Sequence, residues 1–153
     1  MPTPRNSAPQ RKKKFVAVTK NDTALPAAKR IDNWFAKQGW QAFPFQRQAW
    51  LALKRGRSGL VHATTGAGKT YALWLGALAA FADDVAERPK APPLTVVWLT
   101  PMRALGADTL RSLKTALDAL EVPWTAGVRT GDTPANERAA QGRKLPTVLV
   151  TTP

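Results

Sequence analysis

Residues 63–70 read ATTGAGKT, and this stretch decides the fold. It follows the pattern G-x-x-x-x-G-K-[ST] with alanine at the first position, and it lies between the short apolar segment 59–63 and the apolar run 71–82. Its glycines can adopt backbone conformations in which successive N–H groups converge on phosphate oxygens. The sequence therefore predicts a strand, a phosphate-binding loop and a helix, rather than a glycine-rich turn that carries Lys-Thr by chance.

The loop residues have separate expected roles in binding ATP and Mg²⁺. We expect Lys69 to reach the terminal phosphates and Thr70 to offer its hydroxyl to Mg²⁺, so these two are the candidate catalytic residues. The beginning of the following helix adds a partial positive charge that favours phosphate. The predicted nucleotide contacts in the loop are Ala63, Thr64, Thr65, Gly66, Ala67, Gly68, Lys69 and Thr70.

Apolar patterns on both sides of the loop predict an α/β fold. Strands separated by helices imply right-handed crossovers and a parallel sheet with helices on both faces. Segment 94–99 is apolar nearly throughout, as in a strand that is buried on both faces. The expected helices cover residues 31–39, 46–54, 71–82, 102–120 and a short stretch after Pro134, and the expected strands cover 59–63, 94–99, 122–128 and 147–151.

Composition restricts the classes of protein to which the chain can belong. Its 153 residues carry a formal net charge of +13, which favours a polyanionic partner. Residues 1–30 hold eight basic residues and one acid, and this arm either is disordered or binds phosphates nonspecifically. Because the chain has no cysteine and only one histidine, a disulfide framework and a zinc finger are excluded. No apolar run approaches the about 20 residues of a membrane span, so we expect a cytoplasmic protein without a membrane partner.

The order of the short motifs resembles superfamily 2 DExH/DEAD-box helicases, and in particular the Lhr-like, ligase-associated DNA damage response helicases of bacteria. Residues 44–46, PFQ, resemble the Q motif, in which Gln46 would read the edge of adenine. Alanine is usual in that family at the position of Ala63. Residues 100–105, TPMRAL, resemble motif Ia, which grips the nucleic-acid backbone.

Two further segments extend the resemblance, which spans residues 34–153. Residues 129–133, RTGDT, resemble a segment that lines the same nucleic-acid track, and 151–153, TTP, match motif Ib. All of these segments follow predicted strands, so we expect them at the carboxyl edge of the sheet together with the phosphate loop. The nucleic-acid contacts that the resemblance implies are Pro101, Arg103, Ala104, Gly131, Asp132, Thr151 and Thr152.

The resemblance implies a RecA-like domain and an ATP-dependent DNA helicase with 3′ to 5′ polarity, which acts in DNA repair at the bacterial nucleoid beside a DNA ligase and a nuclease. Residues 31–153 would form the N-terminal part of the first motor domain and would stop before the DExH carboxylates. We therefore expect weak ATP binding without turnover from this chain alone, and an exposed sheet edge that makes it marginally stable. The alternatives are an RNA helicase, a double-strand translocase, and a noncatalytic nucleic-acid-binding module with a vestigial loop.

The aromatic residues have two expected roles, packing in the core and stacking on adenine or on a base. We expect Trp50 and Trp74 in the core, because they lie on the apolar faces of predicted helices. The candidates for stacking on adenine or on a base are Trp34, Trp40 and Phe43.

Overall fold

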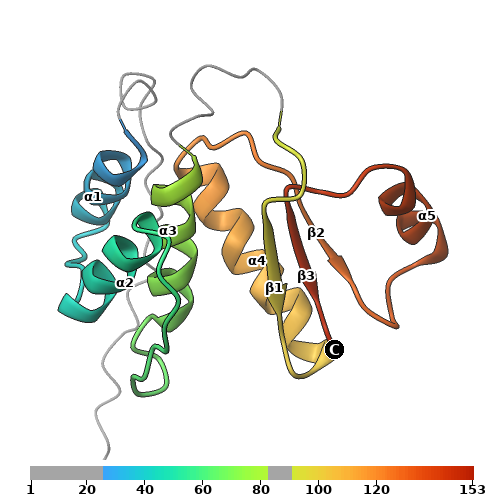
Figure 1. Cartoon of the computed structure of the whole chain (residues 1–153), viewed down its shortest axis with the longest axis horizontal. Coiled ribbons are helices and arrows are strands. Elements are labelled where there is room, and N and C mark those ends of the chain that lie inside the picture. The colour runs from blue at the N-terminus through green and yellow to red at the C-terminus, as the bar shows by residue number, and fades with distance from the viewer. Residues whose placement is uncertain (1–25, 83–90) are drawn as a thin grey trace, which may run out of the picture.

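The computed structural model describes residues 26–82 and 91–153 (Figure 1). The predicted basic arm, which either is disordered or binds phosphates, lies outside the described residues over 1–25. The chain forms helices α1 (Ala27–Lys37), α2 (Pro44–Lys54), α3 (Lys69–Phe81), α4 (Arg103–Ala119) and α5 (Ala135–Arg143), and strands β1 (Val96–Leu99), β2 (Ala126–Arg129) and β3 (Val148–Thr151).

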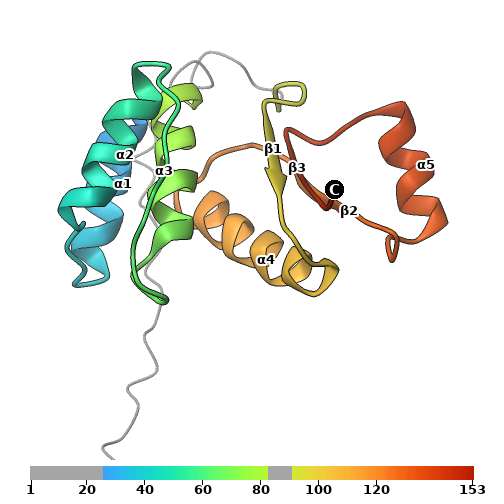
Figure 2. The same cartoon turned by 60° about the horizontal axis from the view of Figure 1, so that its bottom comes forward.

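The strands form a parallel sheet in the order β1-β3-β2, which confirms the predicted α/β class. Leu99, Thr151 and Arg129 lie in one row across the carboxyl end of the sheet, because Thr151 is paired with both of the others. Helix α4 contacts β2 and β3 from one side (Figure 2), and α5 lies beyond β2. The segments that follow the strands therefore meet along one edge, which we call the rim and which consists of residues 100–103, 129–133 and 151–152.

The first expected strand, 59–63, is wrong, because the structure has an irregular segment there. A parallel strand is stable only when a neighbour pairs with its backbone N–H and C=O groups. Among the residues that the structure describes, no strand pairs with this segment, and Leu60 is 92% exposed. The apolar character of 59–63 is therefore not sufficient to form a strand here.

One expectation about burial is also wrong. Strand β1 is not buried on both faces: Val96 and Trp98 pack against the core, whereas Val97 and Leu99 are 54% and 64% exposed. Successive side chains of a strand point to opposite faces, and the face of Val97 and Leu99 is not covered by the described residues.

The folded region also begins earlier than residue 31, because α1 starts at Ala27. The buried guanidinium of Arg30 donates a hydrogen bond of 3.0 Å to the backbone oxygen of Leu120, just after the end of α4. This bond joins the first helix to the helix that covers the sheet, and it makes Arg30 part of the domain rather than of the arm.

Helix α3 lies at the centre of the helical part of the molecule. Trp74, Leu75 and Leu78 are fully buried, and α2 packs along its length. The indole N–H of Trp74 donates to the Leu113 oxygen of α4 at 3.2 Å, which joins the phosphate-loop helix to the sheet side. Trp74 and the partly buried Trp50 both pack in the core, as predicted.

Candidate functional site

The phosphate loop adopts the backbone conformation that its glycines predict. Gly66 and Gly68 have φ of +81° and +83°, in the left-handed region that other residues rarely adopt, and Gly68 is the N-cap of α3. A side chain at position 68 would also bring its Cβ to 2.8 Å from the amide nitrogen of Gln46. Glycine is therefore required at this position both by the backbone angle and by the contact.

Lys69 is folded back over the loop in this structure. Its ammonium group donates hydrogen bonds to the backbone oxygens of Ala63 at 2.7 Å and Thr64 at 2.8 Å. These two oxygens belong to the beginning of the same loop, so the charge is held over the turn that the octapeptide forms. Thr70 follows in the first turn of α3 and is half-buried.

Gln46 is 3% exposed and connects the Q-like segment to the phosphate loop. Its side-chain oxygen accepts the backbone N–H of Phe43 at 2.9 Å, and its side-chain nitrogen donates to the Gly68 oxygen at 3.1 Å. Both ends of the amide are thus engaged by protein backbone. The adenine contact implied by the resemblance stays a prediction, and it would use the second N–H and the second lone pair of the amide.

A cavity of about 390 Å³ opens beside the loop. Among the described residues that line it, Thr70 is the predicted metal ligand and none carries a carboxylate. Its lining includes Ser112 of α4, which sequence reasoning missed because nothing in a helical serine indicates which tertiary neighbour it will have. Burial raises the pKa of the Tyr71 phenol, which also lines the cavity. The lining residues are Thr65, Gly66, Gly68, Lys69, Thr70, Tyr71 and Ser112.

The aromatic residues near the Q-like segment divide into buried and exposed rings. Trp34 is fully buried against Trp40 and Tyr71, so the expectation that it stacks on adenine or a base is wrong. Trp40 is half-buried in the same cluster. Phe43 is exposed and stacked on Phe45 with a centroid distance of 5.9 Å, so its stacking on adenine or a base stays a prediction.

Backbone hydrogen bonds fix the rim. The Thr100 N–H donates to the Thr151 oxygen at 2.9 Å, and the Thr151 hydroxyl donates to the Arg129 oxygen at 2.7 Å. Pro101 and Ala104 are exposed, while Thr151 and Thr152 are half-buried. The residues predicted from motifs Ia and Ib and from the 129–133 segment therefore lie together.

Arg103 and Asp132 form an ion pair across the rim. Their closest atoms, Nη1 and Oδ1, are 3.1 Å apart, and the guanidinium lies against Gly131. The structure thus brings together three of the predicted nucleic-acid contacts and pairs two of them with each other. This pairing was not predicted, because the two charges are separated by 29 positions in the sequence.

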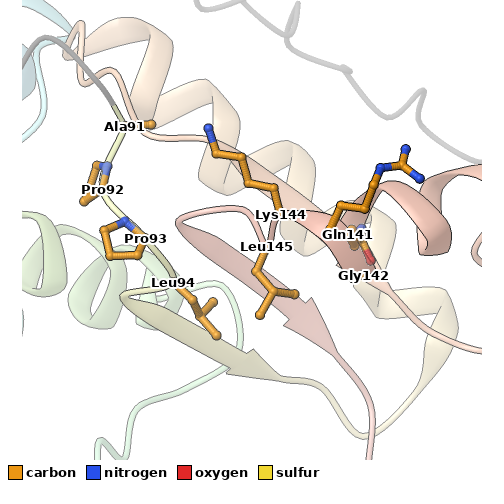
Figure 3. A pocket seen from close by; sticks show the side chains of 9 residues that line it. Ala91, Pro92, Pro93, Leu94, Gln141, Gly142, Lys144 and Leu145 are labelled. Carbon is orange, nitrogen blue, oxygen red and sulfur yellow. The ribbon is translucent and has the colours of Figure 1, made fainter.

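A separate cavity of about 530 Å³ lies at the amino ends of β1 and β3, away from every motif (Figure 3). It is lined by residues 91–94 and 141–145, and none of the predicted site residues contributes to it. The described residues contain no group of three His, Cys, Asp or Glu side chains that could hold a metal ion. None of the helices that the structure describes has the length and apolar character needed to cross a membrane.

Comparisons with known proteins agree with this arrangement. The family model of the DEAD/DEAH box helicases matches residues 43–153. The chain is 35% identical over 146 residues to the Lhr helicase/uracil glycosylase of Escherichia coli and 38% identical over 130 residues to the Lhr helicase/probable uracil glycosylase of Mycolicibacterium smegmatis. These matches cover 86% and 78% of this chain, but only 9% and 8% of the relatives.

A solved structure gives the same result in three dimensions. The Mycobacterium smegmatis helicase Lhr, solved with single-stranded DNA and AMP-PNP, superposes on 84% of this chain with a TM-score of 0.63 and 33% identity. The match covers 17% of that protein. The family model spans the phosphate loop and the whole rim, and the named relatives are helicases of one kind. This chain therefore belongs to the DEAD/DEAH box helicase family and is an Lhr-like superfamily 2 member of it.

Proposed function

We propose that this chain supplies the ATP-binding part of an ATP-dependent DNA translocase that unwinds duplexes. The phosphate loop binds ATP with Mg²⁺, and the rim follows the phosphates of a single DNA strand. The observation that carries this proposal is the braced loop, in which Gly68 is fixed in a left-handed conformation at the beginning of α3 and its carbonyl is held by Gln46.

Nucleotide binding requires Lys69 to exchange its acceptors. The ammonium group now donates to two uncharged backbone oxygens, and in the complex it donates to phosphate oxygens instead. The ammonium charge is present in both states, but only the phosphate oxygens are anionic, so the exchange adds an attraction between opposite charges. Thr70, in the first turn of α3, offers its hydroxyl to the metal ion that accompanies ATP.

We infer that hydrolysis depends on groups other than the described residues that line the cavity beside the loop. A metal-bound phosphoryl transfer site needs a carboxylate that holds the metal and a group that positions water. Acidic side chains are absent from the cavity beside the loop. The chain corresponds to 9% of the length of the relative from Escherichia coli, so a longer protein offers room for these groups and for a second motor domain.

DNA is the proposed track because the similar helicase from Mycobacterium smegmatis was solved with single-stranded DNA. The net charge of +13 supports a polyanionic partner of either kind. The 3′ to 5′ polarity, a role in DNA repair beside a ligase and a nuclease, and association with the bacterial nucleoid are proposals that rest on the resemblance to Lhr-type proteins. An RNA helicase and a double-strand translocase use the same motifs and are the competing proposals.

Strand displacement by the complete gene product tests the proposal. Duplexes with a 3′ or a 5′ single-stranded tail, made of DNA or RNA, are compared with and without ATP. We expect ATP-dependent unwinding of the 3′-tailed DNA, loss of unwinding in Lys69→Ala, and normal unwinding in Lys114→Ala, which removes an exposed lysine on α4. Unwinding that prefers RNA, or that survives Lys69→Ala, would contradict the proposal.

A further inference from the structure

The Arg103–Asp132 pair presents a difficulty for the proposed nucleic-acid contact. Arg103, the first residue of α4, is the basic side chain of the rim that would bind a phosphate. Its guanidinium already donates a hydrogen bond to the Asp132 carboxylate at 3.1 Å. A carboxylate cannot share a hydrogen bond with a phosphate, since both are acceptors at neutral pH. The two side chains are 61% and 68% exposed, so a strand can reach both of them.

The position of the guanidinium is built into the turn after β2. A Cβ at position 131 would lie 2.7 Å from Cζ of Arg103 and 2.8 Å and 3.0 Å from its two terminal nitrogens. Unlike Gly66 and Gly68, Gly131 does not have a left-handed φ, so its backbone would accept alanine. The absence of a side chain at this position therefore provides space for the Arg103 head group.

Hydrogen bonds hold Asp132 on the other side of that space. The Thr133 hydroxyl accepts the Thr130 N–H at 2.8 Å and donates to the Val128 oxygen at 3.3 Å. The Asp132 N–H donates to the Thr130 hydroxyl at 3.3 Å. Thr133 is buried, so the turn is fixed and presents the carboxylate at one place.

We propose that Asp132 is an internal counter-ion which occupies Arg103 until a backbone phosphate displaces it. The inference rests on the proposed nucleic-acid rim and specifies how one of its contacts is made. In this arrangement Asp132 does not bind nucleic acid. It positions Arg103 over Gly131 in the free protein and lowers the affinity of the rim for any strand.

The exchange has a consequence for the salt dependence of binding. Each Lys or Arg side chain that neutralises a phosphate of a single strand normally releases condensed cations. It adds about 0.7 to the magnitude of the slope of log K against log salt concentration. When a phosphate displaces Asp132, the freed carboxylate stays beside the new contact, so the pair neutralises less of the phosphate charge and fewer condensed cations are released. The Arg103 contact in the wild type should therefore contribute little to the slope.

Replacement of Asp132 by its neutral isostere should restore the missing slope. Asp132→Asn leaves the arginine charge without an internal partner, and we expect the slope for single-stranded DNA to steepen by about 0.7. Because exposed ion pairs are weak, affinity at low salt should rise by no more than about fivefold. Asp132→Glu keeps the charge and should stay close to the wild-type slope.

The test measures the affinity of the complete protein for a labelled single-stranded oligonucleotide by fluorescence anisotropy over a series of KCl concentrations. Asp32→Asn is the matched control, since it removes the same charge from an exposed pair, Asp32 with Arg47 at 3.1 Å, that lies on α1 and α2 and outside the rim. We expect a steeper slope and tighter binding in Asp132→Asn only.

Arg103→Ala separates failure of the inference from failure of the proposed rim. One outcome overturns the inference alone. In that outcome Arg103→Ala weakens binding, but Asp132→Asn either weakens binding too or leaves the salt slope unchanged, so Asp132 does not compete with the phosphate for Arg103. If Arg103→Ala leaves affinity unchanged, Arg103 does not bind a phosphate, and both the inference and this part of the proposed rim are wrong.

Discussion

Gln46 is the residue for which the structure and the motif resemblance make different predictions. The resemblance gives its amide to adenine, whereas the structure gives it to the Phe43 N–H and the Gly68 carbonyl. If Gln46 mainly braces the loop, Gln46→Ala should weaken the binding of every ligand that carries the phosphates. If it mainly reads the base, only ligands with adenine should lose affinity.

The size of the loss follows from the two hydrogen bonds. Gln46 is 3% exposed, and a buried hydrogen bond of this kind contributes about 1 kcal/mol net. Without one or both bonds, the loop of the free protein is less ordered. Ordering it when a ligand binds then costs about 1 to 2 kcal/mol, which raises Kd about five- to thirtyfold. We expect the same factor for ATP and for tripolyphosphate, which has no base.

The assay is competition against a fluorescent ATP analogue with Mg²⁺, using the complete protein. Gln48→Ala is the control, because Gln48 is an exposed glutamine on the same helix. Equal losses for ATP and tripolyphosphate in Gln46→Ala, with no change in Gln48→Ala, support the brace. A loss confined to ATP would refute this reasoning and restore the adenine-reading role.

Four shorter predictions concern the loop, the aromatic cluster, the arm and the chain itself. Gly68→Ala should lower the thermal midpoint more than Gly66→Ala, because both strain a left-handed φ but only the first also meets a neighbouring side chain; equal shifts would count against the contact. Since burial raises the pKa of Tyr71, the unfolded chain loses this proton first, so stability against urea should fall as the pH rises above about 10, and Tyr71→Phe should flatten that fall. Deletion of residues 1–25, which precede α1, should reduce the salt slope on single strands by about 0.7 for each phosphate contact that the arm makes, and an unchanged slope would leave the arm without such contacts. The 153-residue chain should bind ATP weakly in equilibrium dialysis and show no multiple turnover in a phosphate-release assay; sustained turnover would contradict this expectation.

Local patterns were sufficient to predict most of the helices and strands. The helix after the phosphate loop, the long helix α4 and the strands β1 and β3 each have an apolar pattern that their neighbours in the sequence support. Segment 59–63 has a similar apolar pattern and does not form a strand. Whether this segment forms a strand depends on a neighbouring strand that pairs with it. The apolar pattern of the segment contains no information about that neighbour.

The candidate site was predictable in position but not in its contacts. The loop motif placed Lys69 and Thr70 at the start of α3, and the motif order placed Arg103 and Asp132 at one edge of the sheet. Which atoms meet there depends on how segments distant in the sequence pack. The Gln46 bond to Gly68 and the Arg103–Asp132 pair are therefore results of the structure.

The most direct test of the account is the ATPase activity of the complete gene product with and without single-stranded DNA, for the wild type and Lys69→Ala. We expect hydrolysis that DNA stimulates strongly and that Lys69→Ala abolishes, because Lys69 is the positive charge of the phosphate loop. Hydrolysis that is indifferent to DNA, or that persists at the wild-type rate in Lys69→Ala, would contradict the assignment of residues 63–70 as the ATP site of a DNA motor.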